Sequence, residues 1–134
     1  MTCEKVTNYE NNYQRDCILE TLKQIERMQK EAYKETDCVT CTGPLIRKVF
    51  DTKPVTITLK CGTKFTAYLG LTNCETDLFR VEEVKNNCVL LRLLKLEGPQ
   101  VNCTNYTALV DVDCICALQC FPPVKCHIDK HDVC

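Results

Sequence analysis

The residues of this 134-residue chain best able to do chemistry are its 13 cysteines. A cysteine thiolate can attack a disulfide, bind a metal ion or be oxidised to a disulfide, and the redox state of the compartment decides among these outcomes. An odd number of cysteines cannot be fully paired within one molecule. At least one sulfur therefore stays reduced, binds metal or bonds to another chain. We interpret this composition as favouring a structural protein that becomes cross-linked.

The N-terminus does not carry the pattern of a secretion signal. Residues 1–16 are polar throughout, whereas a signal peptide has a basic and then an apolar region. The longest mostly apolar stretch, from Cys88 to Leu96, is interrupted by Arg92 and Lys95 and is far shorter than the roughly 20 apolar residues of a membrane helix. We therefore expect that the chain does not insert into a membrane. We also expect that it is made in a reducing compartment, where a cysteine-dense protein binds metal or meets an oxidant later.

Length, composition and charge narrow the possible functions. A chain of 134 residues that is 45% hydrophobic can build a core without disulfides, so its cysteines are surplus to folding. The 17 basic and 18 acidic residues are interspersed, and a basic run that would bind nucleic acid is absent. The net charge of −1 favours self-association. Because the sequence has no phosphate-binding loop, paired-acid constellation or metalloprotease motif, we expect no enzyme and no catalytic residues.

The pattern of apolar residues predicts a polar N-terminal arm over 1–15, a single domain over 16–121 and a C-terminal tail over 122–134. Within the domain, apolar residues recur at spacings of three and four from 16 to 34, which predicts an amphipathic helix with Asp16 as its N-cap. Cys17 would then lie at the helix N-terminus, where the helix dipole favours a thiolate, or would simply begin the helix.

Residues 45–121 have the pattern of β-structure. Alternation over 55–59 and 65–69 predicts one hairpin. A second hairpin joins 79–84 to 88–94 through a turn at Asn86 and Asn87, and leucines on both faces of its second arm predict a central strand that a helix covers on one side. A loop over 97–107 and a final strand over 108–120 follow. We therefore predict an α+β fold, mainly antiparallel β, in which the helix precedes hairpins that form a compact sandwich or barrel-like sheet.

The expected positions of the cysteines divide them into two groups. Those in the arm, the loops, the tail, the helix start or the end of the last strand are candidates for intermolecular disulfides: Cys3, Cys17, Cys38, Cys41, Cys120, Cys126 and Cys134. Those at turns or within strands are candidates for intramolecular bridges or buried thiols: Cys61, Cys74, Cys88, Cys103, Cys114 and Cys116. Strand alternation places Cys114 and Cys116 on one face, about 6.5 to 7 Å apart, at or beyond the Cα limit for bridging to each other.

Two cysteine motifs leave a metal site open as an alternative. Cys38 and Cys41 have the spacing of a redox pair or of half a zinc site, but they follow a helix and precede a proline, which is not the usual setting of a redox pair. The tail offers thiolate and imidazole ligands that suit tetrahedral zinc: Cys126, His127, His131 and Cys134. The alternative function is a zinc-binding interaction module built from these residues, and without it we expect no cofactor.

The second predicted hairpin and the run CxCAxQC from Cys114 to Cys120 resemble the spore coat CotY/CotZ and exosporium ExsY family. The resemblance extends over about residues 16–121. It implies a cysteine-rich structural protein of bacterial endospores, made in the mother-cell cytoplasm and deposited on the spore surface as outer coat, crust or exosporium. It also implies a homo-oligomer, a ring or hexamer within a two-dimensional hexagonal lattice hardened by intermolecular disulfides, with other coat or exosporium proteins as partners.

Overall fold

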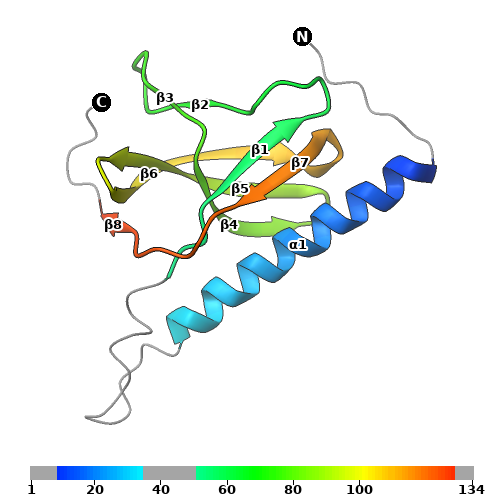
Figure 1. Ribbon diagram of the computed structural model, residues 1–134, viewed down its shortest axis with the longest axis horizontal. Coiled ribbons are helices and arrows are strands. Elements are labelled where there is room, and N and C mark those ends of the chain that lie inside the picture. Colours follow the sequence, from blue (N-terminus) through cyan, green and yellow to red (C-terminus); the bar gives the residue numbers. More distant parts are fainter. Residues whose placement is uncertain (1–8, 35–50, 129–134) are drawn as a thin grey trace.

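The structure, a computed structural model, describes residues 9–34 and 51–128, and the side chains of residues 16–31 and 51–127 (Figure 1). Its elements in chain order are α1 (Tyr9–Lys34), β1 (Val55–Leu59), β2 (Ala67–Tyr68), β3 (Glu75–Thr76), β4 (Phe79–Lys85), β5 (Cys88–Glu97), β6 (Gln100–Asp111), the short 3₁₀ helix η2 (Val112–Cys114), β7 (Ile115–Cys120) and β8 (His127–Ile128). The predicted α+β class with one N-terminal helix is confirmed.

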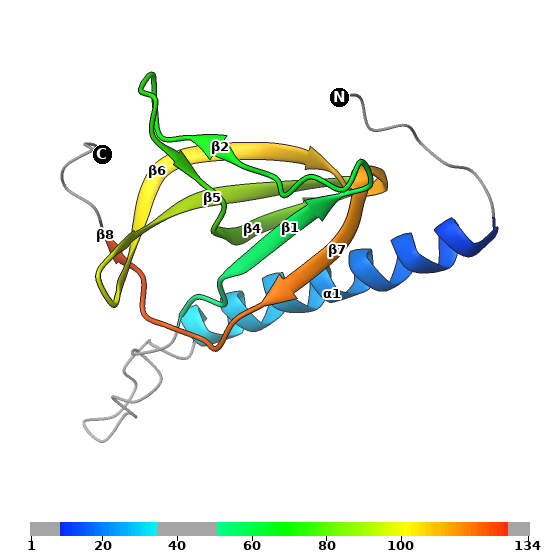
Figure 2. The ribbon, with the colours of Figure 1, turned by 45° about the horizontal axis from the view of Figure 1, so that its top comes forward.

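The strands form a six-stranded sheet in the order β7-β1-β4-β5-β6-β8, and β2 and β3 form a separate two-stranded ribbon. All pairings are antiparallel except that of β6 with β8. Only η2 separates β6 from β7 in the chain, although four strand pairings separate them in the sheet order, so the sheet curls back on itself (Figure 2). The edge strands β7 and β8 do not pair with each other, and the barrel-like sheet therefore stays open.

The second predicted hairpin is confirmed. β4 and β5 pair from Phe79 with Leu93 to Lys85 with Cys88. Asn86 occupies the turn with φ 56°, a left-handed conformation that asparagine tolerates better than most residues. β5 lies between β4 and β6, as its leucines on both faces predict.

The first predicted hairpin is wrong in its pairing. β1 pairs along its length with β7, from Val55 with Cys120 to Leu59 with Ile115, and β2 pairs with β3. Only an isolated bridge between Thr58 and Lys64 remains of the expected hairpin. An alternating sequence specifies which face of a strand is buried but not which strand lies beside it, and distant β7 provides the partner.

The predicted loop over 97–107 is also wrong, because β6 begins at Gln100 and includes most of it. Two of its polar residues, Asn102 and Thr104, are buried in the sheet: Thr104 is 2% exposed, and its hydroxyl donates to the carbonyl of Leu93 at 2.8 Å. The predicted last strand is interrupted by η2, which Asp111 caps by accepting from the backbone N–H of Asp113. Cys114 therefore lies in η2 and Cys116 in β7, so the two do not belong to one strand as expected.

Helix α1 begins at Tyr9, earlier than predicted, so Asp16 is not its N-cap and Cys17 is an interior helical residue. The residues before Asp16 lack apolar periodicity, but extending an existing helix costs little once its core-facing turns have formed. Those turns bury Ile18, Leu22 and Ile25 against the strands.

Polar side chains of α1 complete the hydrogen bonding of β4. β1 pairs with β4 only at Val55 and Phe79. Farther along β4, helix α1 and not β1 provides hydrogen-bond partners for the β4 backbone. Gln29, 5% exposed, donates to the carbonyl of Val81 at 2.6 Å and accepts from the backbone N–H of Lys53 at 3.0 Å. The Glu26 carboxylate accepts from the N–H of Val84 at 3.1 Å. These bonds fix the helix against the sheet, since buried backbone groups need partners.

Candidate cross-linking sites

One pair of cysteines is bridged inside the chain. Cys103 in β6 and Cys126, just before β8, form a disulfide with a Cα–Cα distance of 5.4 Å. The parallel pairing of Asn102 with His127 brings the tail against β6, and the bridge lies beside a small apolar cluster that includes Leu94 and Val101. The prediction that Cys126 is an intermolecular cysteine is therefore wrong, because a distant strand gives it a partner within the chain.

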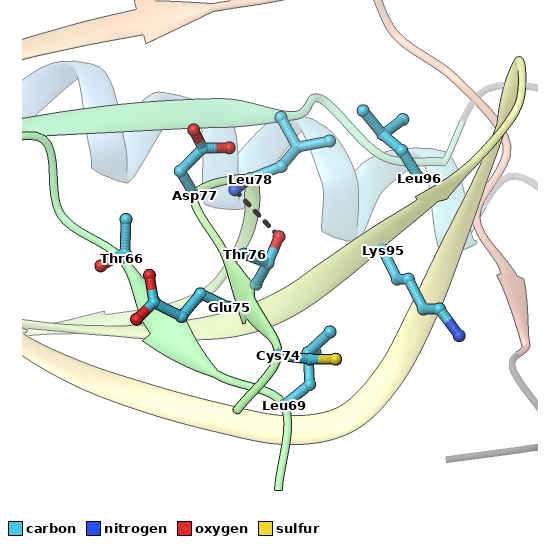
Figure 3. Close-up of a pocket in the computed structure, with 9 residues that line it drawn as sticks. All are labelled: Thr66, Leu69, Cys74, Glu75, Thr76, Asp77, Leu78, Lys95 and Leu96. Atoms are coloured by element: carbon cyan, nitrogen blue, oxygen red, sulfur yellow. Dashed lines mark hydrogen bonds between the residues drawn. The ribbon is translucent and has the colours of Figure 1, made fainter. Parts of the chain in front are cut away.

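Cys74 is also disulfide-bonded, and it lines a pocket of about 540 Å³ between the β2–β3 ribbon and the end of β5. Figure 3 shows its sulfur beside Leu69, with the carboxylates of Glu75 and Asp77 and the ammonium group of Lys95 on the same walls. The N–H of Leu78 donates to the Thr76 hydroxyl at 3.3 Å. The wall combines apolar and charged side chains, and its one sulfur is already bonded.

Three thiols in the described part of the chain are both exposed and unbridged: Cys17 on α1, Cys88 at the start of β5 and Cys120 at the end of β7. Cys114 in η2 is a partly buried thiol, and Cys61 and Cys116 are half-buried. The expectation of a buried or internally bridged Cys88 is wrong. Cys88 directly follows the two-residue turn, and its side chain lies on the outer face of the sheet while that of Val89 enters the core.

The thiols of Cys88 and Cys114 lie toward one end of the β5–β6 pair. The internal disulfide lies toward the other end. Cys88 pairs with Asp111, which leads directly into η2 and Cys114. Cys103, by contrast, pairs with Leu94 near the far end of β5. The turn between β4 and β5 and the turn after β6 thus bring thiols to the η2 end, which sequence spacing alone cannot reveal.

The predicted metal ligands are only partly covered by the structure. Cys38 and Cys41, and likewise Cys3, His131 and Cys134, lie outside the described residues. Cys126 cannot supply a thiolate while it is bonded to Cys103, and His127 is exposed. Across residues 16–31 and 51–127, no group of three or more His, Cys, Asp or Glu side chains is arranged to hold a metal ion.

A charged network lies on the outer face of β4 and β5. One oxygen of the Glu82 carboxylate accepts from Arg80 and from Arg92, each at 2.7 Å. Arg80 also donates to the Thr52 hydroxyl at 3.0 Å, and Arg92 to the carbonyl of Thr104 at 3.0 Å. Partial burial raises the pKa of Glu82, but the hydrogen bonds from Arg92 and Arg80 outweigh it, so that the pKa of Glu82 is lower than usual.

Because this pKa is lowered by folding, ionised Glu82 stabilises the native state above the pKa of an unfolded glutamate, and the stabilisation is lost as pH falls through the folded value. We expect Glu82→Gln to lower the free energy of unfolding at pH 7 by about 0.5 to 1 kcal/mol, since the ion pair is partly exposed. The variant should lose less stability than the parent between neutral and acid pH. Urea titrations at several pH values measure both effects, and parallel pH curves for the two proteins would contradict the prediction.

The described helix α1 is not long and apolar enough to cross a membrane. The fold and its sulfurs together define a class: a small α+β domain with an apolar core, an internal disulfide and separate surface thiols. The sequence model of the family described as "Spore coat protein Z" matches residues 1–109. The chain therefore belongs to the spore coat protein Z family.

Spore coat protein Z of Bacillus subtilis (strain 168) is 29% identical to this chain over 134 aligned positions, which cover 80% of this chain and 89% of the relative. No solved structure matches the chain. Family membership confirms the predicted resemblance and identifies a cysteine-rich structural protein of the spore coat, deposited at the spore surface. The run from Cys114 to Cys120, which carries part of the resemblance, lies beyond the residues that the family model matches.

Proposed function

We propose that this chain is a self-assembling building block of the outer spore layers, in which copies associate into a two-dimensional lattice that intermolecular disulfides then harden. The observation that carries the proposal is the division of its sulfurs. Cys103 and Cys126 are bonded within the domain, whereas Cys17, Cys88 and Cys120 are exposed, unbridged thiols. A stable fold with spare surface thiols is what a cross-linked coat requires.

The proposed order of events follows from the core. Ile57, Phe79 and Leu91 are fully buried, so apolar packing can hold the fold while the thiols are still reduced in the mother-cell cytoplasm. Copies then associate, as rings or hexamers in the proposed lattice and alongside other coat or exosporium proteins, through repeated interfaces that extend a sheet. Oxidation follows association.

Disulfide formation is favoured once two thiols are held close together. Two S–H bonds break, one S–S bond forms, and dioxygen accepts the two protons and two electrons to give hydrogen peroxide. Association raises the effective concentration of one thiol at another, so that weak contacts become covalent links. Many such links make dissociation slow and give the layer resistance to heat and solvents.

The test compares the purified full-length chain with and without reductant, by electron microscopy and by non-reducing gel electrophoresis. We expect ordered rings or sheets, and multimers that reductant dissolves after exposure to dioxygen. A variant with Cys17→Ser, Cys88→Ser and Cys120→Ser should lose most of these multimers. The control variant with Cys103→Ser and Cys126→Ser should retain them, because those sulfurs are bonded within the chain.

Recovery of monomers with every unbridged thiol still reduced, after the same exposure to dioxygen, would overturn the proposal. The zinc-module alternative gives a different result in the same preparations. It requires stoichiometric zinc in protein purified without chelator, and unfolding when a chelator is added.

A further inference from the structure

An apolar and charged surface surrounds the exposed thiol of Cys88. It comprises six outward-facing residues on β4, β5 and β6, here called the Cys88 patch: Glu83, Lys85, Cys88, Leu90, Leu109 and Asp111. Directly paired residues of adjacent strands have their side chains on the same face of the sheet. The pairings Lys85–Cys88 and Cys88–Asp111 form one row on this surface, and the pairings Glu83–Leu90 and Leu90–Leu109 form the next row.

This surface is the outer face of the sheet. The intervening residues Val89 and Val110 point the other way and are buried in the core. Cys88 and Lys85 are exposed, and Leu109 is 67% exposed. An exposed leucine on its own needs no explanation. Here, however, Leu109 lies beside half-buried Leu90, and the neighbouring pair on the same face, Cys88 with Asp111, carries a free thiol.

The charges in the row through Cys88 are complementary to themselves. Lys85 and Asp111 flank Cys88 on opposite sides, in one row across three strands. If a two-fold axis runs along β5 over Cys88, rotation reverses this row, and Lys85 of each copy faces Asp111 of the other. A two-fold contact of this kind uses the same surface twice, and a residue on the axis meets its own counterpart.

We propose that two copies of this chain dock face to face through the Cys88 patch and that the contact is locked by a disulfide between the two Cys88 residues. The inference rests on the proposed function and names one interface of the assembly. On the axis Leu90 of each copy contacts Leu90 of the other, Glu83 of each copy lies opposite Leu109 of the other, and the Lys85–Asp111 pairs set the orientation. In the locking step the two Cys88 thiols lose two protons and two electrons to dioxygen, which is reduced to hydrogen peroxide.

The first test is the identity of the linked cysteines. The full-length chain is incubated with dioxygen, unreacted thiols are alkylated, and the reductant-sensitive dimer is digested and examined by mass spectrometry. We expect a peptide linked through Cys88 to Cys88, and loss of the dimer band in Cys88→Ser. The matched control is Cys17→Ser, which removes another exposed, unbridged thiol and should leave the dimer in place.

The second test asks whether docking precedes oxidation. Leu90→Lys, at a half-buried position, and Lys85→Glu, at an exposed position, should each slow formation of the Cys88-linked dimer. The first replaces the apolar contact on the axis with two facing ammonium groups, and the second places a carboxylate opposite that of Asp111 in the other copy. The control is Lys125→Glu, which makes the same charge change on an exposed lysine outside the patch. Circular dichroism checks that each variant is folded.

The outcomes separate this inference from the proposed function. Multimers linked only through other cysteines, or a dimer yield unchanged by Cys88→Ser, would overturn the Cys88 contact and leave the proposed function intact. Equal rates of Cys88 linkage in Leu90→Lys, Lys85→Glu and the Lys125→Glu control would also overturn the docking surface. A wild-type chain that forms no reductant-sensitive multimer overturns both.

Discussion

We expect Phe79→Ala to lower the free energy of unfolding by about 3 to 5 kcal/mol, the usual cost of deleting a buried phenylalanine ring. Phe79 is 0% exposed, and its ring stacks on that of Phe65 with centroids 5.3 Å apart. It also pairs with Val55 where β1 meets β4 and with Leu93 in β5. Loss of the Phe79 ring opens a cavity where β1 meets β4 in the curled sheet.

Urea denaturation of Phe79→Ala in the presence of reductant measures this effect on the core without its disulfides. The matched control is Tyr68→Ala, which removes an aromatic ring that is 59% exposed and should change stability by less than about 0.5 kcal/mol. A parent protein that is already unfolded in reductant would contradict the idea behind the prediction, because disulfides and not apolar packing would then hold the domain together.

The parts of the fold that the sequence predicts correctly are those set by local patterns. The three- and four-residue spacing of Ile18, Leu22 and Ile25 predicts the helix, and the apolar strands around Asn86 predict the hairpin of β4 and β5. The errors concern long-range pairing. Nothing local in the sequence of β1 indicates that β7 is its neighbour. Thr104 lies in a polar stretch typical of a loop, and it can be buried in β6 because its hydroxyl donates to the carbonyl of Leu93.

The cysteine chemistry shows the same division between local and distant information. The number of cysteines and their expected positions in loops and termini favour cross-linking from the sequence alone. The partner of a given sulfur, however, depends on the tertiary fold. Cys126 looks like a tail cysteine until β8 pairs with β6 and brings it to Cys103. Cys88 looks like a turn cysteine that could be buried, and only the register of β4, β5 and β6 shows that it faces outward between Lys85 and Asp111.

The contact between α1 and the sheet leads to the second large expected effect. Leu22 is 0% exposed and lies in the main core cluster between Ile18 and Ile25 on the inner face of the helix. We expect Leu22→Ala to lower the free energy of unfolding by about 2 to 5 kcal/mol, because it removes a buried side chain and leaves a cavity under the helix. Alanine favours the helical backbone, so helix propensity cannot account for the loss.

The same substitution should weaken the hydrogen bonds that the helix makes to β4. Glu26 and Gln29 follow Leu22 on α1 and bond to the backbone of Val84 and Val81. If the helix is held mainly by its apolar face, the amide of Val84 should exchange with solvent faster in Leu22→Ala than in the parent protein. Met28→Ala is the control, since Met28 is 44% exposed on the same helix. Equal stability of the two variants, with unchanged exchange at Val84, would mean that the polar contacts alone hold α1 against the sheet.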